Sequence, residues 1–248
     1  METYQEFLNR IQAFELPLLS LRDGDFIANA SVAEKVNENH AFHPFYGDTV
    51  VFDLSEQEKS QLNHMIEQLY QEAPDCFSER LINSTMHMTL HDLSNFPVLA
   101  EVFDKMQENE IQLRQLLSDM PIPEQSIQMK SQAVFNMVNT SLVLGLYPAD
   151  AQEYKKLMYL YSLIDRIMKL PYPMTPHITL AYYRRKGFSQ ENKRKLEHVV
   201  NTLNQSSHTF HLTTKRLYYQ HFESMNAYNN ILKLMDMTIN QGEKYYDL

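Results

Sequence analysis

The chain has 248 residues, 44% of them hydrophobic, which is enough to bury a core as one domain or as two small lobes. Its formal net charge of −9 argues against long duplex nucleic acid as a partner, because binding to a duplex depends on neutralising phosphates with basic side chains. Cys76 is the single cysteine, which excludes an intramolecular disulfide and a cysteine-rich zinc site.

The same features indicate where the protein works. A lone cysteine is typical of a reducing, cytoplasmic setting. The N-terminal segment is acidic and amphipathic, unlike a secretory signal, and no run of about 18 uninterrupted apolar residues occurs. We therefore expect a cytoplasmic monomer without a membrane partner, whose charge is compatible with a small anionic ligand or a short RNA end.

The pattern of apolar and turn-forming residues predicts the elements in chain order. Residues 1–45 are predicted to form one helix followed by irregular structure. The first predicted strand, 46–54, leads into a capping box at 55–58 that opens the next helix. Later strands are predicted over 81–93, 127–138, 140–147, 175–184, 209–222 and, with helix as the alternative, 228–237. Later helices are predicted over 98–119, with a break near Asn109, over 150–169 and over 189–204.

The order of these elements repeats. A series of strand, helix, strand, helix and strand occurs twice after residue 45. Val51 precedes His87 by 36 residues, and Val143 precedes His177 by 34. Such a duplication predicts an α+β fold of two lobes, in which antiparallel sheets flank a central cleft and helices lie outside. A cleft between lobes is the default ligand site.

The predicted organisation is therefore an extension and one domain. Residues 1–45 form the extension, which lies outside the repeat and is a candidate cap over one lobe. Residues 46–248 form a single bilobal catalytic domain, with repeat halves at about 46–138 and 139–248.

Each half contains one copy of the same short motif, T-x-H-x-T-L. It stands at residues 85–90 (TMHMTL) and at residues 175–180 (TPHITL). For this composition, the chance expectation of the H-x-T-L core is roughly 0.06 copies. Two copies at matching places in a repeat therefore indicate a functional site.

The motif suits acid–base chemistry on phosphate. Side chains alternate across a strand, so the histidine and both threonines of each copy are expected on one face. Hydrolysis of a phosphodiester needs a base for the attacking oxygen and an acid for the departing one, and imidazole can serve as either near neutral pH. Threonine hydroxyls can donate to the non-bridging oxygens. This scheme needs no metal and no cofactor.

At these motifs the sequence resembles the 2H phosphoesterases, the superfamily of LigT-like RNA 2′,3′-cyclic phosphodiesterases and 2′–5′ RNA ligases. By element order, the resemblance covers residues 46–248. It implies a bilobal fold with pseudo-two-fold symmetry. It also implies that His87 and His177 are the catalytic acid–base pair and that Thr89 and Thr179 bind the phosphate.

Further residues are candidates by position. Thr85 and Thr175 open the two motifs and are expected to add substrate contacts. Tyr183 belongs to a segment, 182–185, that follows the second motif, where base stacking or phosphate contact competes with a plain strand end entering a solvated loop. His91 lies four residues after the first motif histidine and is expected at the rim.

The predicted function is hydrolysis of a small phosphodiester by the two histidines. The first choice of substrate is a 2′,3′-cyclic phosphate of a nucleotide or RNA end, followed by a 2′–5′ linkage or a cyclic oligonucleotide. The assignment of acid and base to the two histidines stays open. One alternative is a non-catalytic module that binds a nucleotide or RNA end in the same pocket. Another is a metal-dependent hydrolase that uses other histidines.

Overall fold

The computed structural model describes residues 2–14, 24–236 and 238–239. Its strands form two antiparallel sheets of five and four strands. The first sheet has the order β2-β1-β7-β8-β9, with bounds His87–Phe96, Tyr46–Asp53, Leu217–Ser224, Ala227–Lys233 and Thr238–Ile239. The second has the order β5-β4-β3-β6, with bounds His177–Tyr182, Ser141–Pro148, Ser126–Met137 and Thr209–Thr213.

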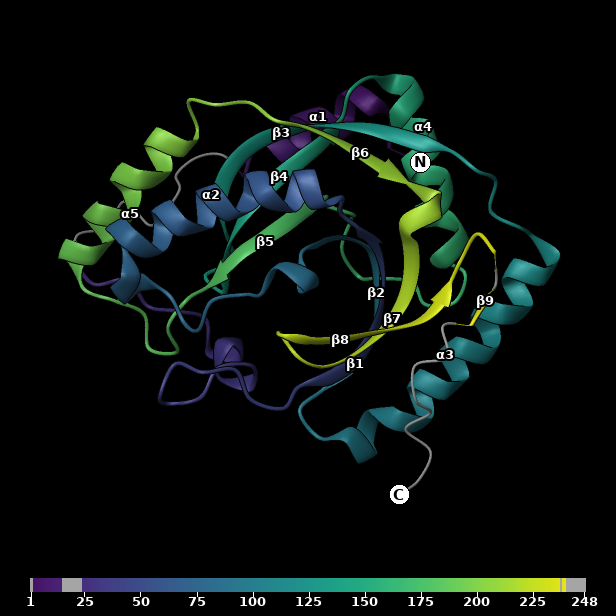
Figure 1. The fold of residues 1–248 in the computed structure, drawn as a ribbon, viewed down its shortest axis with the longest axis horizontal. Helices are drawn as coiled ribbons and strands as arrows, with labels where there is room; N and C mark the ends of the chain where they lie inside the picture. Colours follow the sequence, from purple (N-terminus) through teal and green to yellow (C-terminus); the bar gives the residue numbers. More distant parts are fainter. Residues whose placement is uncertain (1, 15–23, 237, 240–248) are drawn as a thin grey trace.

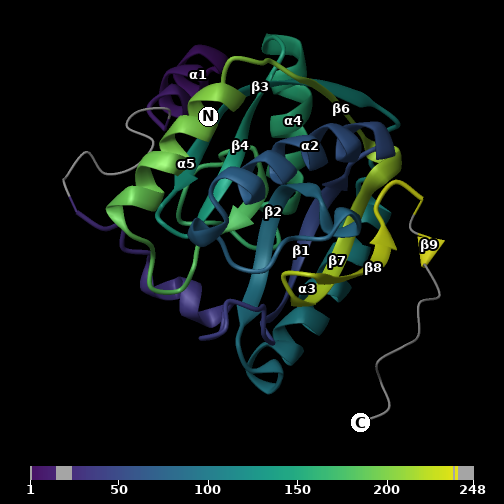
Figure 2. The ribbon, with the colours of Figure 1, turned by 60° about the vertical axis from the view of Figure 1, so that its left-hand side comes forward.

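Five α-helices accompany the sheets in the described ranges. They are α1 Tyr4–Gln12, α2 Glu56–Glu72, α3 Leu99–Asp119, α4 Ala151–Ile164 and α5 Gln190–Leu203. α3 contacts β1 and β2 and lies outside the first sheet, α4 contacts β3 and β4, and α2 packs along α5 (Figures 1 and 2). The predicted α+β architecture of two sheets with external helices is confirmed. None of these helices is both long and apolar enough to cross a bilayer.

The two sheets exchange strands between the predicted halves of the sequence. β3 falls in the first half but pairs with β4 and β6 of the second sheet. The segment 209–222, predicted as one strand, is two strands that belong to different sheets (Figure 1). A short 3-10 turn, Thr214–Arg216, separates them, and the buried Thr214 hydroxyl donates to the Pro123 carbonyl at 3.0 Å. The first sheet therefore takes β7, β8 and β9 from the second half, and the second sheet takes β3 from the first half, so neither sheet is built from one contiguous half.

Local signals place the helix starts correctly. Ser55 caps α2, and its side chain and that of Glu58 form the predicted capping box. Asp150 caps α4 by accepting from the backbone of Gln152 and Glu153. The helix itself stops at Ile164, earlier than the predicted residue 169.

The predicted break near Asn109 does not occur, because α3 runs without interruption. Asn109 is fully buried and faces the first sheet. Its Nδ2 atom donates to Asp48 Oδ2 at 2.9 Å and to Ser94 Oγ at 2.8 Å. The polar residue that suggested a break is instead the partner of a buried carboxylate.

The N-terminal helix α1 packs on the lobe of the second sheet. Phe7 and Ile11 of α1 are buried against Tyr154 of α4. Gln132 of β3 donates to the Ile11 carbonyl at 2.7 Å. Arg10 of α1 reaches the cavity between the lobes.

Candidate active site

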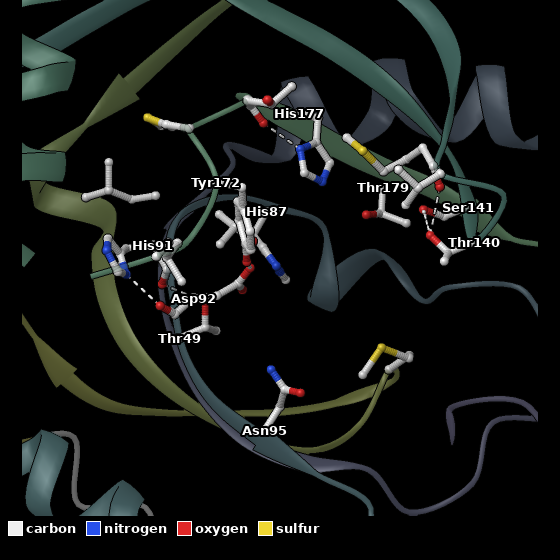
Figure 3. A pocket seen from close by; sticks show the side chains of 18 of the residues that line it. Thr49, His87, His91, Asp92, Asn95, Thr140, Ser141, Tyr172, His177 and Thr179 are labelled. Carbon is white, nitrogen blue, oxygen red and sulfur yellow. Dashed lines mark hydrogen bonds between the residues drawn. The ribbon is translucent and has the colours of Figure 1, made fainter. Parts of the chain in front are cut away.

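β2 and β5 present the two motifs in the same register. Val51 of β1 lies opposite Thr89, and Val143 of β4 lies opposite Thr179. This equivalence matches the spacing of the two halves in the sequence. Both β2 and β5 are edge strands, and they contact each other where the two sheets meet. The histidine and both threonines of each motif therefore line one cavity. His87 and His177 face it from different strands (Figure 3).

The two imidazoles are oriented in the same way. Nδ1 of His87 donates to the carbonyl of Thr85, and Nδ1 of His177 donates to the carbonyl of Thr175, both at 2.7 Å. A carbonyl oxygen can only accept, so the hydrogen of a neutral ring sits on Nδ1. Nε2 is then left without a hydrogen and is available to the cavity as a base.

The cavity walls keep both rings neutral. Burial lowers the pKa of His87 to about 4, although the Thr85 carbonyl and the charge of Asp92 oppose this shift. Burial also lowers the pKa of His177, although the Thr175 carbonyl and the charge of Asp92 oppose this shift. Without a ligand at neutral pH, each histidine is therefore an unprotonated base. A bound anion would favour protonation of the nearer ring and thereby create the acid.

Thr89 and Thr179 occupy the positions that the motif predicts. Both line the cavity, and each lies two residues after its histidine on the same strand face. Figure 3 shows Thr179 beside His177. Among the described residues, neither hydroxyl has a hydrogen-bond partner. Two hydroxyls without partners beside two imidazoles form a set of donors suited to phosphate oxygens.

Thr85 and Thr175 also line the cavity, but they lie just before their strands rather than within them. Thr85 ends a 3-10 turn, Asn83–Thr85, and its hydroxyl donates to the Ile82 carbonyl at 2.8 Å. The Thr175 hydroxyl accepts from Arg10 Nη1 at 3.4 Å. Their established contacts with the histidines are made by backbone carbonyls, which orient the rings.

A β-bulge follows each histidine at the last residue of the motif. The register of β2 on β1 shifts at Leu90, and that of β5 on β4 shifts at Leu180. An extra residue in one strand reverses the alternation of side chains beyond it. Asp92 and Tyr182 therefore face the cavity five residues after their histidines.

The prediction that Tyr183 contacts the substrate is wrong, because the bulge turns its side chain away from the cavity. Strict alternation from His177 would point Tyr183 at the cavity, but the residue is fully buried and does not line it. Its ring packs edge-on against Phe26 at 4.8 Å and stacks on Phe77 at 6.2 Å. Tyr183 is a core residue, and Tyr182 takes the cavity position instead.

His91 differs from its prediction for the same reason. It is buried in the wall of the cavity rather than exposed at the rim. Its Nδ1 atom donates to the Asp92 carbonyl at 2.5 Å, and Nε2 lies 3.4 Å from Asp165 Oδ1. Its ring lies 5.0 Å from that of Tyr161. These contacts give His91 a structural role in holding α4 against β2.

Asp92 is a site residue that sequence reasoning missed. Its charge raises the pKa of both motif histidines, so it lies within electrostatic reach of each. Tyr172 donates to Asp92 Oδ2 at 3.4 Å, and burial together with this carboxylate raises the pKa of Tyr172 to about 12. Asp92 forms no salt bridge with any described residue. Only the pairing of β2 with β1 reveals the bulge, so the sequence carried no signal for it.

Tyr228 of β8 is a second residue that was missed. Its ring lies 5.1 Å from the imidazole of His87. Burial raises the pKa of Tyr228 well above its ordinary value, so the hydroxyl stays protonated and can donate. The sequence placed Tyr228 at the start of a strand, but not next to the first motif.

The cavity has a volume of about 560 Å³, which suits a small ligand. Its polar lining includes the four motif threonines, the two histidines, Thr49, Ser141, Asn95 and Asp92. Within the described ranges, no group of three or more His, Cys, Asp or Glu side chains is placed to hold a metal ion.

No protein-family model matches the sequence, and no curated protein matches it. Solved structures with a similar fold were found, however. A conserved protein of unknown function from Agrobacterium tumefaciens is 17% identical, with a TM-score of 0.63 over 82% of this chain and 91% of that chain.

Other similar structures come from two further bacteria. E. coli LigT complexed with 3′-AMP is 17% identical, with a TM-score of 0.47 over 75% of this chain and 95% of that one. A protein from Thermus thermophilus is 11% identical, with a TM-score of 0.47 over 74% of this chain and 94% of that one. The chain therefore shares its bilobal fold with the Agrobacterium protein, and within that fold it carries the paired histidine motifs by which it resembles the LigT-like 2H phosphoesterases.

Proposed function

We propose that this protein is a metal-independent phosphodiesterase that hydrolyses a small phosphodiester. The observation that carries the proposal is the matched orientation of His87 and His177. Each Nδ1 is held by a backbone carbonyl at 2.7 Å, which leaves both Nε2 atoms to one cavity. Thr89 and Thr179 add a hydroxyl beside each ring. A binding pocket alone would not need two bases set in this way.

In the proposed reaction, Nε2 of one histidine removes a proton from water as the water oxygen forms a bond to phosphorus. The bond between phosphorus and the leaving oxygen breaks on the opposite side. Nε2 of the other, protonated histidine gives its proton to that oxygen. The hydroxyls of Thr89, Thr179 and Tyr228 donate to the non-bridging oxygens as negative charge builds up there. Exchange of protons with solvent restores the pair.

A 2′,3′-cyclic phosphate of a nucleotide or RNA end is the first choice of substrate, because hydrolysis of its ring needs only water, one base and one acid. The product is a phosphomonoester with a free neighbouring hydroxyl. A 2′–5′ linkage or a cyclic oligonucleotide is the second choice. His87, His177, Thr89 and Thr179 would act on it in the same way.

The test is a screen of 2′,3′-cyclic nucleotides, 3′,5′-cyclic nucleotides and 2′–5′ dinucleotides, run with and without EDTA. We expect turnover of at least one class that survives EDTA and is lost in His87→Ala and His177→Ala. Tight binding without product from the wild-type protein would favour the non-catalytic module. Activity that EDTA abolishes would favour a metal-dependent hydrolase.

A further inference from the structure

One wall of the cavity is aromatic and begins at the first motif histidine. The ring of His87 lies 5.1 Å from that of Tyr228, which lies 5.3 Å from that of Phe222. Phe222 in turn stacks on Phe45, with centroids 6.0 Å apart. All four side chains line the cavity. We call Phe45, Phe222 and Tyr228 the aromatic wall.

The ammonium group of Lys35 lies at the end of the aromatic wall. Its Nζ atom is 4.9 Å from the centroid of Phe45 and 5.6 Å from that of Tyr182. Lys35 belongs to the N-terminal extension, outside the repeated core, yet it lines the cavity. Its backbone is fixed, because its N–H donates to the Val32 carbonyl at 3.0 Å and its carbonyl accepts from His43 at 3.2 Å.

Lys35 has no anionic partner among the described residues. An ammonium group has three donors, and contact with ring faces uses none of them in a hydrogen bond. The other cation that lines the cavity, Arg10, is already paired with Glu2 at 2.8 Å. The carboxylate of Asp92 accepts from Tyr172 instead. The cavity therefore holds one cation whose charge no described side chain neutralises.

We infer that Lys35 binds a second anionic group of the substrate, and that the aromatic wall holds the organic part that joins this group to the scissile phosphodiester. The inference rests on the proposed function, because it places the scissile phosphate at His87 and His177. It narrows the substrate class to phosphodiesters with a further phosphate or carboxylate. A charged hydrogen bond in such a site is worth about tenfold or more in affinity.

The test compares three ligands, adenosine 2′,3′-cyclic phosphate with a 5′-hydroxyl, a 5′-phosphate or a 5′-diphosphate. Calorimetric binding is measured on the His87→Ala/His177→Ala protein, so that nothing is consumed, and KM is measured on the active protein. Each is repeated with Lys35→Met, with Lys35→Arg, which keeps the charge, and with Lys105→Met. Lys105 is an exposed lysine of α3, paired with Glu108, and serves as the control.

We expect at least one of the 5′-phosphorylated ligands to bind about tenfold more tightly than the 5′-hydroxyl ligand. Lys35→Met should remove that difference, Lys35→Arg should keep part of it, and Lys105→Met should leave it intact. Equal binding of all three ligands would overturn the inference, as would a Lys35→Met variant that retains the preference. If the preference appears in binding but the active protein cleaves none of the three, the inference stands and the proposed function fails for these compounds.

Discussion

Asp92 and Tyr182 occupy equivalent positions in the two sheets. Asp92 lies opposite Thr49 of β1, and Tyr182 lies opposite Ser141 of β4, each just beyond a β-bulge. Both side chains face the cavity, but only one of them carries a charge. The two lobes therefore present matched histidines in unmatched electrostatic surroundings, and the site is symmetric in geometry but not in charge.

Replacing Asp92 should move the pH dependence of the reaction. The Asp92 carboxylate raises the pKa of His87 and of His177, against the larger opposite effect of burial. Asp92→Asn should therefore lower both pKa values further. The acid histidine must be protonated to act. The decline of activity on the alkaline side should therefore begin at a lower pH in Asp92→Asn than in the wild type. The measurement is kcat/KM against pH, with Asp104→Asn on the exposed face of α3 as the control. An unchanged alkaline limb in Asp92→Asn would contradict this role.

Removing either motif histidine should remove one proton transfer. We expect His87→Ala and His177→Ala each to lower kcat by about 10²- to 10⁴-fold, the usual contribution of a positioned acid or base. Each should also change a bell-shaped pH–rate profile into one with a single limb, and the limb that disappears identifies the role of that residue. His208→Ala, on the loop before β6, is the control. A bell shape that survived both substitutions would exclude the pair as acid and base.

The motif threonines should affect catalysis without affecting stability. Thr89→Val and Thr179→Val keep the shape of the side chain and remove only a hydroxyl without a described partner. A hydrogen bond to a charged group is worth about 1.5–3 kcal/mol, so kcat/KM should fall about 10- to 100-fold in each. The melting temperature should match that of Thr209→Val, an exposed threonine of β6. A large loss of stability with little loss of activity would assign these residues to the fold.

Asn109 should contribute to stability because it donates a hydrogen bond to the buried carboxylate of Asp48. Asp48 accepts from Asn109 Nδ2, from the Tyr219 hydroxyl at 2.9 Å and from the Ser94 amide at 2.7 Å. Asn109→Leu leaves one of these bonds unmade and should cost about 2–4 kcal/mol in the free energy of unfolding, as seen when a buried charge loses a partner. Denaturant titration measures it, with Gln115→Leu on the exposed face of α3 as the control.

Asp48 should also make the free energy of unfolding depend on pH, in a direction that follows from its pKa. Burial raises the pKa of Asp48 in the folded protein, and the hydrogen bonds from Asn109 and its other partners oppose the shift without cancelling it. The contribution of Asp48 to stability is therefore greatest below its unfolded pKa and is lost as the pH rises through the folded value. Asp48→Asn should flatten this part of the curve of unfolding free energy against pH. A steeper fall in stability on acidification in the wild type than in Asp48→Asn, over the same range, would contradict the assignment.

The sequence by itself determined the features that depend on neighbours along the chain. The capping box at Ser55, the paired motifs and the two histidines were all readable because a few adjacent residues specify them. The two-sheet architecture followed as well, since the repeat and the alternation of apolar residues predict where strands fall.

Tertiary structure decided everything that depends on which strand pairs with which. The bulges at Leu90 and Leu180 are defined only by the pairing with β1 and β4. Because of them, the side chain of Asp92 faces the cavity and that of Tyr183 packs in the core. The turn after β6 moved the chain from one sheet to the other, which placed Tyr228 beside His87. Strand register is set by hydrogen bonds between residues far apart in sequence, so no local pattern contains it.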